Sequence, residues 1–162
     1  MKITFVPKSF DVPTKVLLTP FHLTVLEESN AEVDYQAVMS SLKRLKSIFG
    51  PNTSWPSEKM SLEENIVSLQ THLREFIVRD AFAYSVFDES KTKCLGAIYI
   101  DPSRSAFYDC EVYLWVREDS ADLDAILHTS MLTWLTEHWP FDKIAFPGRS
   151  ISWQDWATEC AI

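Results

Sequence analysis

Residues 109–127 read DCEVYLWVREDSADLDAIL, and this stretch decides the fold. Up to Val116 polar or aromatic residues alternate with aliphatic ones, which is the period of a β-strand. The alternation places on one face Asp109, Glu111, Tyr113 and Trp115, and on the other Cys110, Val112, Leu114 and Val116. Apolar residues at helical spacing begin at Leu123, so a strand runs almost directly into a helix. The first amide groups of such a helix lack partners within it, and solvent or a ligand must satisfy them.

Three successive strands are predicted ahead of that helix. Residues 82–87, 93–100 and 106–117 alternate apolar and polar side chains, and short turn-like segments separate them. Such short connections favour an antiparallel meander. We expect the aliphatic face of the last strand to pack on helices, and its polar and aromatic face to line a groove.

Two helices are predicted before the meander. A serine followed three residues later by glutamate marks a capping box at Ser29 and again at Ser61. Apolar residues then recur every three or four positions, which predicts helices over residues 29–49 and 61–79. A half-buried strand at residues 21–26 precedes both helices.

The third helix is predicted to begin at Ser120 or Asp122 as its cap and to end before Pro140. Residues 141–146 then have the pattern of a short strand. A helical crossover makes this strand parallel to the strand before the helix. The order β-α-α-β-β-β-α-β therefore predicts the α+β class, with a mixed, mostly antiparallel sheet flanked by helices.

The chain is expected to form a single domain over residues 1–162. Three prolines divide residues 1–20, which predicts an extended arm with an edge strand at residues 3–6. Residues 147–162 form a short tail in which we expect little regular structure.

The composition limits the function classes. Hydrophobic residues make up 46% of the chain and aromatic residues 13%, which excludes low-complexity disorder. A net charge of −8 disfavours nucleic acid and anionic membranes as partners. The apolar runs are far shorter than the roughly 20 residues that cross a bilayer. Three cysteines without Cys-x-x-Cys spacing, and no signal-peptide pattern, lead us to expect a soluble cytoplasmic protein.

The order of elements over residues 21–146 resembles the GNAT superfamily of acyl-CoA-dependent N-acyltransferases. Residues 94–100, CLGAIYI, resemble the family's third strand, where a glycine follows an apolar residue. Residues 112–117, VYLWVR, resemble its fourth strand. The resemblance implies an N-acetyltransferase with acetyl-CoA as acyl donor and an amine of a small molecule or peptide as acceptor. A catalytically inactive GNAT-like binding or dimerisation module is the alternative, and a homodimer is a further expectation.

The resemblance also implies a cofactor site. In the family the end of the fourth strand parts from the fifth strand and bonds the pantetheine arm. The pyrophosphate lies on a loop of pattern Arg/Gln-x-x-Gly-x-Gly/Ala at the helix start, which corresponds here to residues 117–122. The predicted cofactor-binding residues are therefore Trp115, Val116, Arg117, Ser120, Ala121 and Asp122. Ser and Asp replace the two small residues of the pattern, and acidic caps of the helix are the alternative interpretation of this loop.

Glu111 resembles the fourth-strand carboxylate with which many family members deprotonate the amine. Tyr84, Tyr99 and Tyr113 are predicted to line the substrate groove beside it. The alternatives are a carboxylate at a wet sheet surface or paired with an arginine, and ordinary packing of the tyrosines. The family's general acid, a tyrosine after the fifth strand, has no counterpart here. Arg149 is either a carboxylate or phosphate ligand or a surface arginine.

Other chemistries find little support in the sequence. The three glycines form neither a phosphate-binding loop nor a dinucleotide fingerprint. A single His72-x-x-Glu75 pair on a helix is a weak metal signal, and we predict no metal site.

Overall fold

The computed structural model describes residues 3–160 and holds, within them, one six-stranded sheet. The strands are β1 Lys15–Leu18, β2 Phe21–Val25, β3 Phe82–Asp88, β4 Cys94–Pro102, β5 Cys110–Val116 and β6 Ile144–Ala145. They lie side by side in sequence order, and every neighbouring pair is antiparallel except β5 and β6, which run parallel. The predicted α+β class, the antiparallel meander and the parallel last strand are confirmed.

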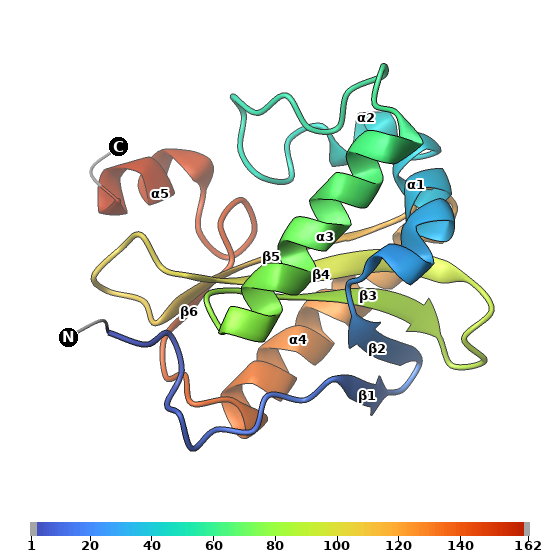
Figure 1. Ribbon diagram of the computed structural model, residues 1–162. Helices are drawn as coiled ribbons and strands as arrows, with labels where there is room; N and C mark the ends of the chain where they lie inside the picture. Colours follow the sequence, from blue (N-terminus) through green and yellow to red (C-terminus); the bar gives the residue numbers. More distant parts are fainter. Residues whose placement is uncertain (1–2, 161–162) are drawn as a thin grey trace.

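Helices cover both faces of the sheet. They are α1 Ala31–Met39, α2 Leu42–Leu45, α3 Leu62–Val78, α4 Asp124–His138 and α5 Trp153–Glu159, with short 3₁₀ helices at Glu28–Asn30 and Glu118–Leu123. Figure 1 shows α1, α2 and α3 above the sheet and α4 below it. None of the helices in residues 3–160 combines the length and the apolar character that a membrane span requires.

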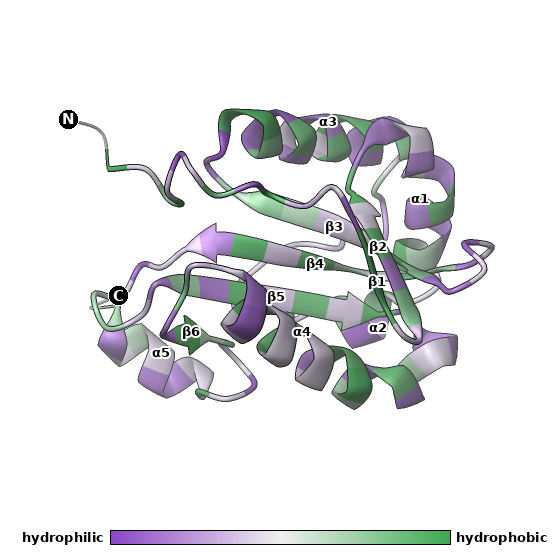
Figure 2. Cartoon of the chain, turned by 90° about the horizontal axis from the view of Figure 1, so that it is seen from below, coloured by the Kyte–Doolittle hydropathy of each residue, from purple (hydrophilic) through white to green (hydrophobic). Residues whose placement is uncertain are grey.

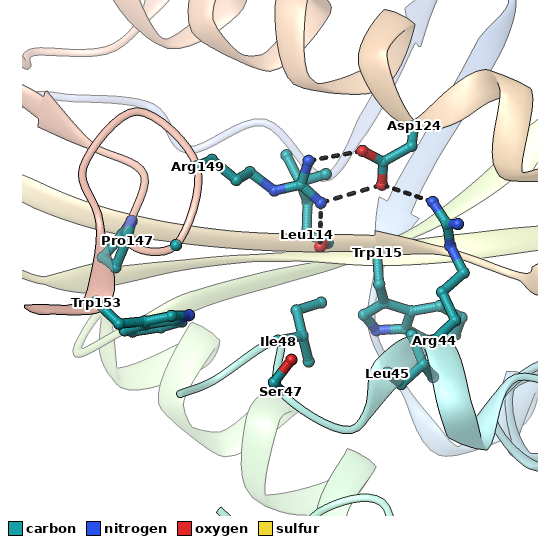
Figure 3. Close-up of a pocket in the computed structure, with 11 residues that line it drawn as sticks. Arg44, Leu45, Ser47, Ile48, Leu114, Trp115, Asp124, Pro147, Arg149 and Trp153 are labelled. Atoms are coloured by element: carbon teal, nitrogen blue, oxygen red, sulfur yellow. Dashed lines mark hydrogen bonds and ion pairs between the residues drawn. The ribbon is translucent and has the colours of Figure 1, made fainter. Parts of the chain in front are cut away.

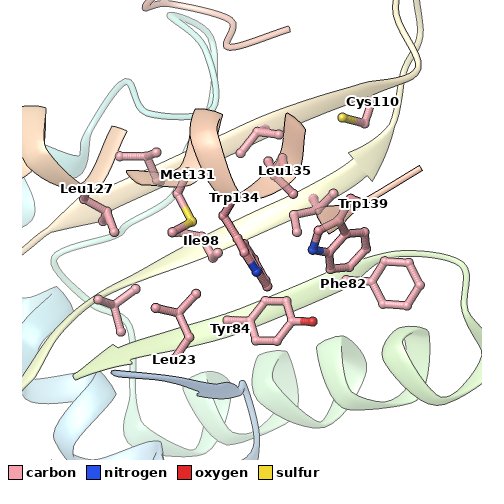
Figure 4. Packing of buried hydrophobic residues seen from close by; sticks show 14 of the residues in the cluster. Leu23, Phe82, Tyr84, Ile98, Cys110, Leu127, Met131, Trp134, Leu135 and Trp139 are labelled. Carbon is pink, nitrogen blue, oxygen red and sulfur yellow. The ribbon is translucent and has the colours of Figure 1, made fainter. Parts of the chain in front are cut away.

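The alternation predicted for β5 is confirmed, and it divides the interior into two cores. The core on the α4 side contains Cys110, Val112, Leu114 and Val116 together with Leu127, Met131, Trp134 and Leu135 of α4. Figure 4 shows several of these side chains packed against β3 and β4. Tyr113 and Trp115 belong to the second core, beneath α1, α2 and α3. Every residue of β5 is buried, so the strand is covered on both faces.

The central strands lie close together at Gly96, where β4 faces the end of β5. A Cβ atom at Gly96 would come within 1.8 Å of the carbonyl oxygen of Trp115, so no other residue fits without moving the strands. In Figure 2 these strands are largely green, and the C-terminal end of β4 is purple. That polar end of a buried strand becomes part of the candidate site.

Helix α3 follows its sequence signals closely. The Ser61 hydroxyl accepts a hydrogen bond from the amide of Glu64 at 3.1 Å, which caps the helix as predicted. Leu69 and Phe76 are buried on the apolar stripe. The helix ends at Arg79, whose φ of 65° is left-handed, and the Arg79 guanidinium donates to two carbonyls of the N-terminal arm.

The helix predicted over residues 29–49 is wrong in two respects. The Ser29 hydroxyl donates to Glu27 instead of capping a helix, and α1 begins only at Ala31. The helix then breaks at Ser40 and Ser41, after which α2 makes one further turn. The apolar spacing continues through the break, but the Ser41 hydroxyl accepts a hydrogen bond from the amide of Glu118 at 2.9 Å. A serine bonded to another segment thus competes with the regular helix.

The two ends of the chain also differ from the prediction. The edge strand of the arm is β1, at Lys15–Leu18, and not at residues 3–6. Residues 147–160 contain α5, which the Ser152 hydroxyl caps by accepting from the amide of Asp155. Neither Ser120 nor Asp122 caps α4, because a 3₁₀ helix occupies residues 118–123 first.

Candidate functional site

The parallel strands β5 and β6 part after a short contact. They pair at two positions of β5, Cys110 and Glu111, and β6 then ends. The chain turns away at Gly148, whose φ of 80° suits glycine, and a Cβ there would lie 2.6 Å from the indole nitrogen of Trp153. β5 continues to Val116, so the C-terminal part of this strand has an edge that β6 does not cover.

A cleft of about 330 Å³ lies beside this uncovered edge. Its walls come from α2 and the residues after it, the end of β5, the start of α4, the turn after β6 and the start of α5. The lining residues are Arg44, Leu45, Ser47, Ile48, Leu114, Trp115, Asp124, Pro147, Gly148, Arg149 and Trp153. Three stretches that are distant in sequence, within residues 44–48, 114–124 and 147–153, therefore meet at one place.

Three charged side chains, here called the arginine cluster, lie in this cleft: Arg44, Asp124 and Arg149 (Figure 3). The two terminal nitrogens of Arg149 donate to the Asp124 carboxylate at 2.6 and 3.0 Å, and a terminal nitrogen of Arg44 lies 3.3 Å from the same group. Burial tends to raise the pKa of Asp124, but the two guanidinium groups outweigh it and hold that pKa below its ordinary value. Two cations thus share one anion, which leaves a surplus positive charge.

The same guanidinium groups cover the backbone of β5. Arg149 donates to the carbonyl of Leu114 at 3.1 Å, and Arg44 donates through Nε to the carbonyl of Val116 at 3.1 Å. In a continuous sheet a neighbouring strand would bond these carbonyls. Side chains therefore replace a strand at the point where β5 and β6 part.

The loop that follows β5 points its polar groups elsewhere. The Arg117 amide donates to the Leu95 carbonyl, and its guanidinium donates to the Cys94 carbonyl and pairs with Asp119 at 2.7 Å. Ser120 is buried, and its hydroxyl lies 3.4 Å from Asp119. The amide of Ser120 donates to the carbonyl of Arg117.

The structure thus divides the predicted cofactor residues into two groups. Trp115 lines the cleft, and the carbonyl of Val116 bonds a cleft residue. Those that do not line the cleft are Arg117, Ser120, Ala121 and Asp122. The acid that faces the cleft is Asp124 and not Asp122, because the 3₁₀ helix shifts the start of α4.

Two carboxylates face each other where β4 and β5 pair, toward the start of β5. Asp101 lies opposite Glu111 in the strand register, and we call these two residues the carboxylate pair. Arg104 donates through Nε to both oxygens of Glu111, at 3.0 and 3.3 Å, and through Nη2 to the Tyr113 hydroxyl at 3.2 Å. Glu111 is only 4% exposed, so of the two alternative interpretations the arginine-paired carboxylate describes it and the wet sheet surface does not.

Burial alters the proton affinity of the carboxylate pair. Burial raises the pKa of Asp101 to about 7, and the charges of Glu111 and Glu75 add to the effect, while Arg104 opposes it. Burial also raises the pKa of Glu111, against the effect of Arg104. Arg104 is ion-paired with Glu111 and acts on Asp101 only through its charge, so the pair holds a proton close to neutral pH.

Aromatic side chains connect the carboxylate pair to the cleft. The Tyr113 ring lies parallel to that of Trp153, with 6.3 Å between ring centres, and Phe49 packs on both Tyr99 and Tyr113. The Trp115 indole donates to the Tyr99 hydroxyl at 3.0 Å. Two of the three predicted groove tyrosines thus lie together on one face of the sheet.

Tyr84 is not part of this group, and its placement in the groove is wrong. It lies opposite Ile98 in the register, one residue out of step with Tyr99, and so points to the α4 side (Figure 4). Its ring packs against Phe76 and Trp134, and its hydroxyl donates to the Pro13 carbonyl. Tyr84 is a core residue that fastens the arm.

Asp101, Arg104, Arg44 and Asp124 were not predicted as site residues. Asp101 cannot be identified without the register of the β4–β5 hairpin, because only this register shows that it lies opposite Glu111. The arginine cluster draws on side chains from three separate parts of the chain, and no local pattern marks such a group. Of its members, Arg149 has a signal in the sequence as a possible anion ligand.

Neither a family model nor a curated protein matches this sequence. Solved structures do match it. The ribosomal-protein-S5-alanine acetyltransferase from Vibrio fischeri superposes with a TM-score of 0.63 at 15% identity, over 93% of this chain and 82% of that one. The microcin C7 self-immunity acetyltransferase MccE, in complex with acetyl-CoA and AMP, gives a TM-score of 0.63 at 14% identity, over 92% and 82%.

A third similar structure is the Salmonella typhimurium acetyltransferase that modifies the N-terminal serine of ribosomal protein L7/L12. Its TM-score is 0.58 at 18% identity, over 77% of this chain and 67% of that one. At such identities the likeness establishes a common fold. The expected GNAT layout of the sheet and helices is thereby confirmed.

Proposed function

We propose that this chain, which has the fold of the GNAT acetyltransferases, is an acyl-CoA-dependent N-acyltransferase that transfers an acetyl group to an amine. The observation that carries the proposal is the cleft at the parting of β5 and β6, which presents two guanidinium groups to one carboxylate. In the GNAT layout the acyl-CoA arm lies at this parting. A surplus of positive charge there suits a pyrophosphate.

The residues of the cleft fit acyl-CoA if the arginine cluster exchanges partners. Arg44 and Arg149 would bind phosphate oxygens in place of the Asp124 carboxylate, and this would free the carbonyls of Leu114 and Val116 for the pantetheine amides. Bound acyl-CoA supplies the activated acyl thioester. Trp115 and Val116 keep their predicted roles, and the two arginines take over anion binding from the loop at residues 117–122.

Glu111 is our proposed general base, with Asp101 as the residue that shares its proton. Transfer of an acyl group to an amine releases a proton, and a base works best with a pKa near the working pH. Burial and the charge of Glu111 raise the pKa of Asp101 to about 7, and burial also raises the pKa of Glu111. Arg104 holds the Glu111 carboxylate in place, and its side chain is 51% exposed, which gives the pair a route to solvent.

One observation favours the alternative, a GNAT-like binding or dimerisation module. The arginines of the cluster already donate hydrogen bonds to the free carbonyls of β5 and pair with Asp124. These groups therefore need no ligand as a partner. The amine substrate, a homodimer and a cytoplasmic location remain expectations from the sequence. Binding of CoA separates the two functions.

The test is thermal melting with CoA, followed by thiol release from acetyl-CoA in a panel of amines. A ligand at a hundredfold excess over its Kd adds about 2.7 kcal/mol to stability, which a melting curve detects. We expect CoA to stabilise the protein more than pantetheine does, because pantetheine lacks the phosphates that the arginines would bind. No stabilisation by millimolar CoA would favour the binding module.

A further inference from the structure

A second cavity, of about 220 Å³, lies between α1, α3 and β4. It shares no lining residue with the cleft. Phe49, Trp55 and Tyr99 form aromatic walls, and Leu26 and Leu69 add aliphatic ones. A small apolar cavity of this kind is a place for a compact, flat ligand.

One carboxylate faces this cavity without a cation beside it. Asp34 of α1 lines the cavity and is only 5% exposed. Its Oδ2 accepts a hydrogen bond from the Asn65 side chain at 3.0 Å, and the same amide group donates to the carbonyl of Ala31. Among residues 3–160 no lysine, arginine or histidine nitrogen lies within ion-pair distance of Asp34, and its Oδ1 has no hydrogen-bond partner.

A buried carboxylate without a counterion is costly, and a ligand that supplies the missing charge recovers that cost. The aromatic rings around Asp34 attract the same kind of group, because a cation binds to the face of an aromatic ring. We propose that this cavity binds a small organic ammonium ion, with the carboxylate of Asp34 as its counterion and Trp55, Phe49 and Tyr99 around its apolar body.

The size of the cavity limits the ligand. Its volume equals that of about seven water molecules in the liquid, at ~30 Å³ each. A monoamine with one ring, such as benzylamine, is of this size. The His72 side chain, 30% exposed, also lines the cavity, so the ligand has a way in from solvent beside α3.

The proposal does not rest on acyl transfer, because none of these residues belongs to the cleft or to the carboxylate pair. The test is isothermal titration calorimetry on the whole protein without CoA, using benzylamine and its neutral analogue benzyl alcohol. We expect benzylamine to bind at least about tenfold more tightly than benzyl alcohol. Equal binding of the two, or no binding of millimolar benzylamine, would overturn the proposal.

Two variants make the test specific. Asp34→Asn removes the charge but keeps an oxygen that accepts from Asn65, so it should fold, which a melting curve verifies. It should lose at least about tenfold in benzylamine affinity and bind benzyl alcohol unchanged. Glu32→Gln, on an exposed position of the same helix, is the matched control and should bind as the wild type does. Undiminished benzylamine binding by Asp34→Asn would mean that Asp34 only joins α1 to α3.

A pH series tests the proposal without any variant. Burial raises the pKa of Asp34 to about 6, against the hydrogen bond from Asn65. The titratable groups facing it are His72 from α3 and Tyr99 and Cys94 from β4, and the two on β4 stay protonated because burial raises their pKa values. Benzylamine affinity should therefore fall as the pH is lowered from 8 to 5, and benzyl alcohol affinity should not. The fall should persist in His72→Gln, and its absence there would contradict the role of Asp34.

Discussion

The arginine cluster and the carboxylate pair lie at opposite ends of β5. Cations outnumber anions in the first, and anions outnumber cations in the second. At the end of the strand two arginines share one aspartate. Toward its start, Asp101 and Glu111 lie opposite each other, and a single arginine, Arg104, pairs with Glu111. Both groups lie beside β5, which is buried along its whole length, and charged side chains are uncommon in such surroundings.

The difference indicates what each end of the strand can accept. A surplus cation that is partly open to solvent can exchange its internal partner for an external anion. Two neighbouring carboxylates beside one guanidinium do not both stay charged, and Asp101, whose pKa is raised to about 7, takes up a proton near neutral pH. One strand thus offers an anion site and a proton site, which are the two sites that the proposed acyl transfer requires.

The largest effect is expected at the carboxylate pair. Glu111→Gln keeps the shape of the side chain and removes its basic group, so turnover of acetyl-CoA with an accepted amine should fall by about 10²–10⁴-fold. The Kd for CoA should not change, because Glu111 does not line the cleft. Asp101→Asn is the comparison variant, and a larger loss there than in Glu111→Gln would make Asp101 the base.

Removal of one cation should weaken the anion site next most strongly. Arg149→Gln loses hydrogen bonds to a charged partner, worth about 1.5–3 kcal/mol, so CoA should bind about 10–100-fold more weakly. Lys43→Gln is the matched control, since Lys43 lies exposed on α2 beside Arg44 and outside the cleft. Calorimetry with CoA measures both variants, and equal affinities would remove the arginine cluster from the cofactor site.

Removal of the anion of the same cluster should act in the opposite direction. Asp124→Asn leaves both guanidinium groups without competition, so we expect CoA to bind at least about threefold more tightly. The lowered pKa of Asp124 means that its ionised form stabilises the fold, an effect present above the unfolded pKa and lost as the pH falls through the folded pKa. Stability near pH 7 should therefore drop by about 1 kcal/mol in the variant. Weaker CoA binding would assign Asp124 to the ligand instead of to the arginines.

The carboxylate pair should also make the stability of the protein depend on pH. The pKa of Asp101 is raised to about 7, above its unfolded value, so ionisation of this acid opposes folding. Between pH 8 and pH 6 wild type should therefore gain stability relative to Asp101→Asn, by about 1.4 kcal/mol or roughly 3–6 °C in Tm. If the Tm values of the two proteins instead change by the same amount between pH 8 and pH 6, Asp101 is not the residue that takes up the proton.

Periodicity in the sequence predicts the scaffold well and the charged groups poorly. β5 and α3 follow their hydrophobic patterns, because burial of one face decides where such segments pack. Periodicity places Tyr84 on the wrong face of the sheet, because a shift of one residue in the pairing of β3 with β4 moves every side chain to the other face. The break at Ser41 depends on an amide 77 residues away, which no local pattern reveals.

Residues 40–61, between α1 and α3, form a wall of both cavities. Leu45 and Ile48 line the cleft, whereas Phe49 and Trp55 line the second cavity, which contains Asp34. The segment is fastened to the end of β5 through Ser41 and Arg44. A ligand that shifts this wall in one cavity therefore alters the affinity of the other, and thermodynamic linkage makes the coupling factor the same in both directions.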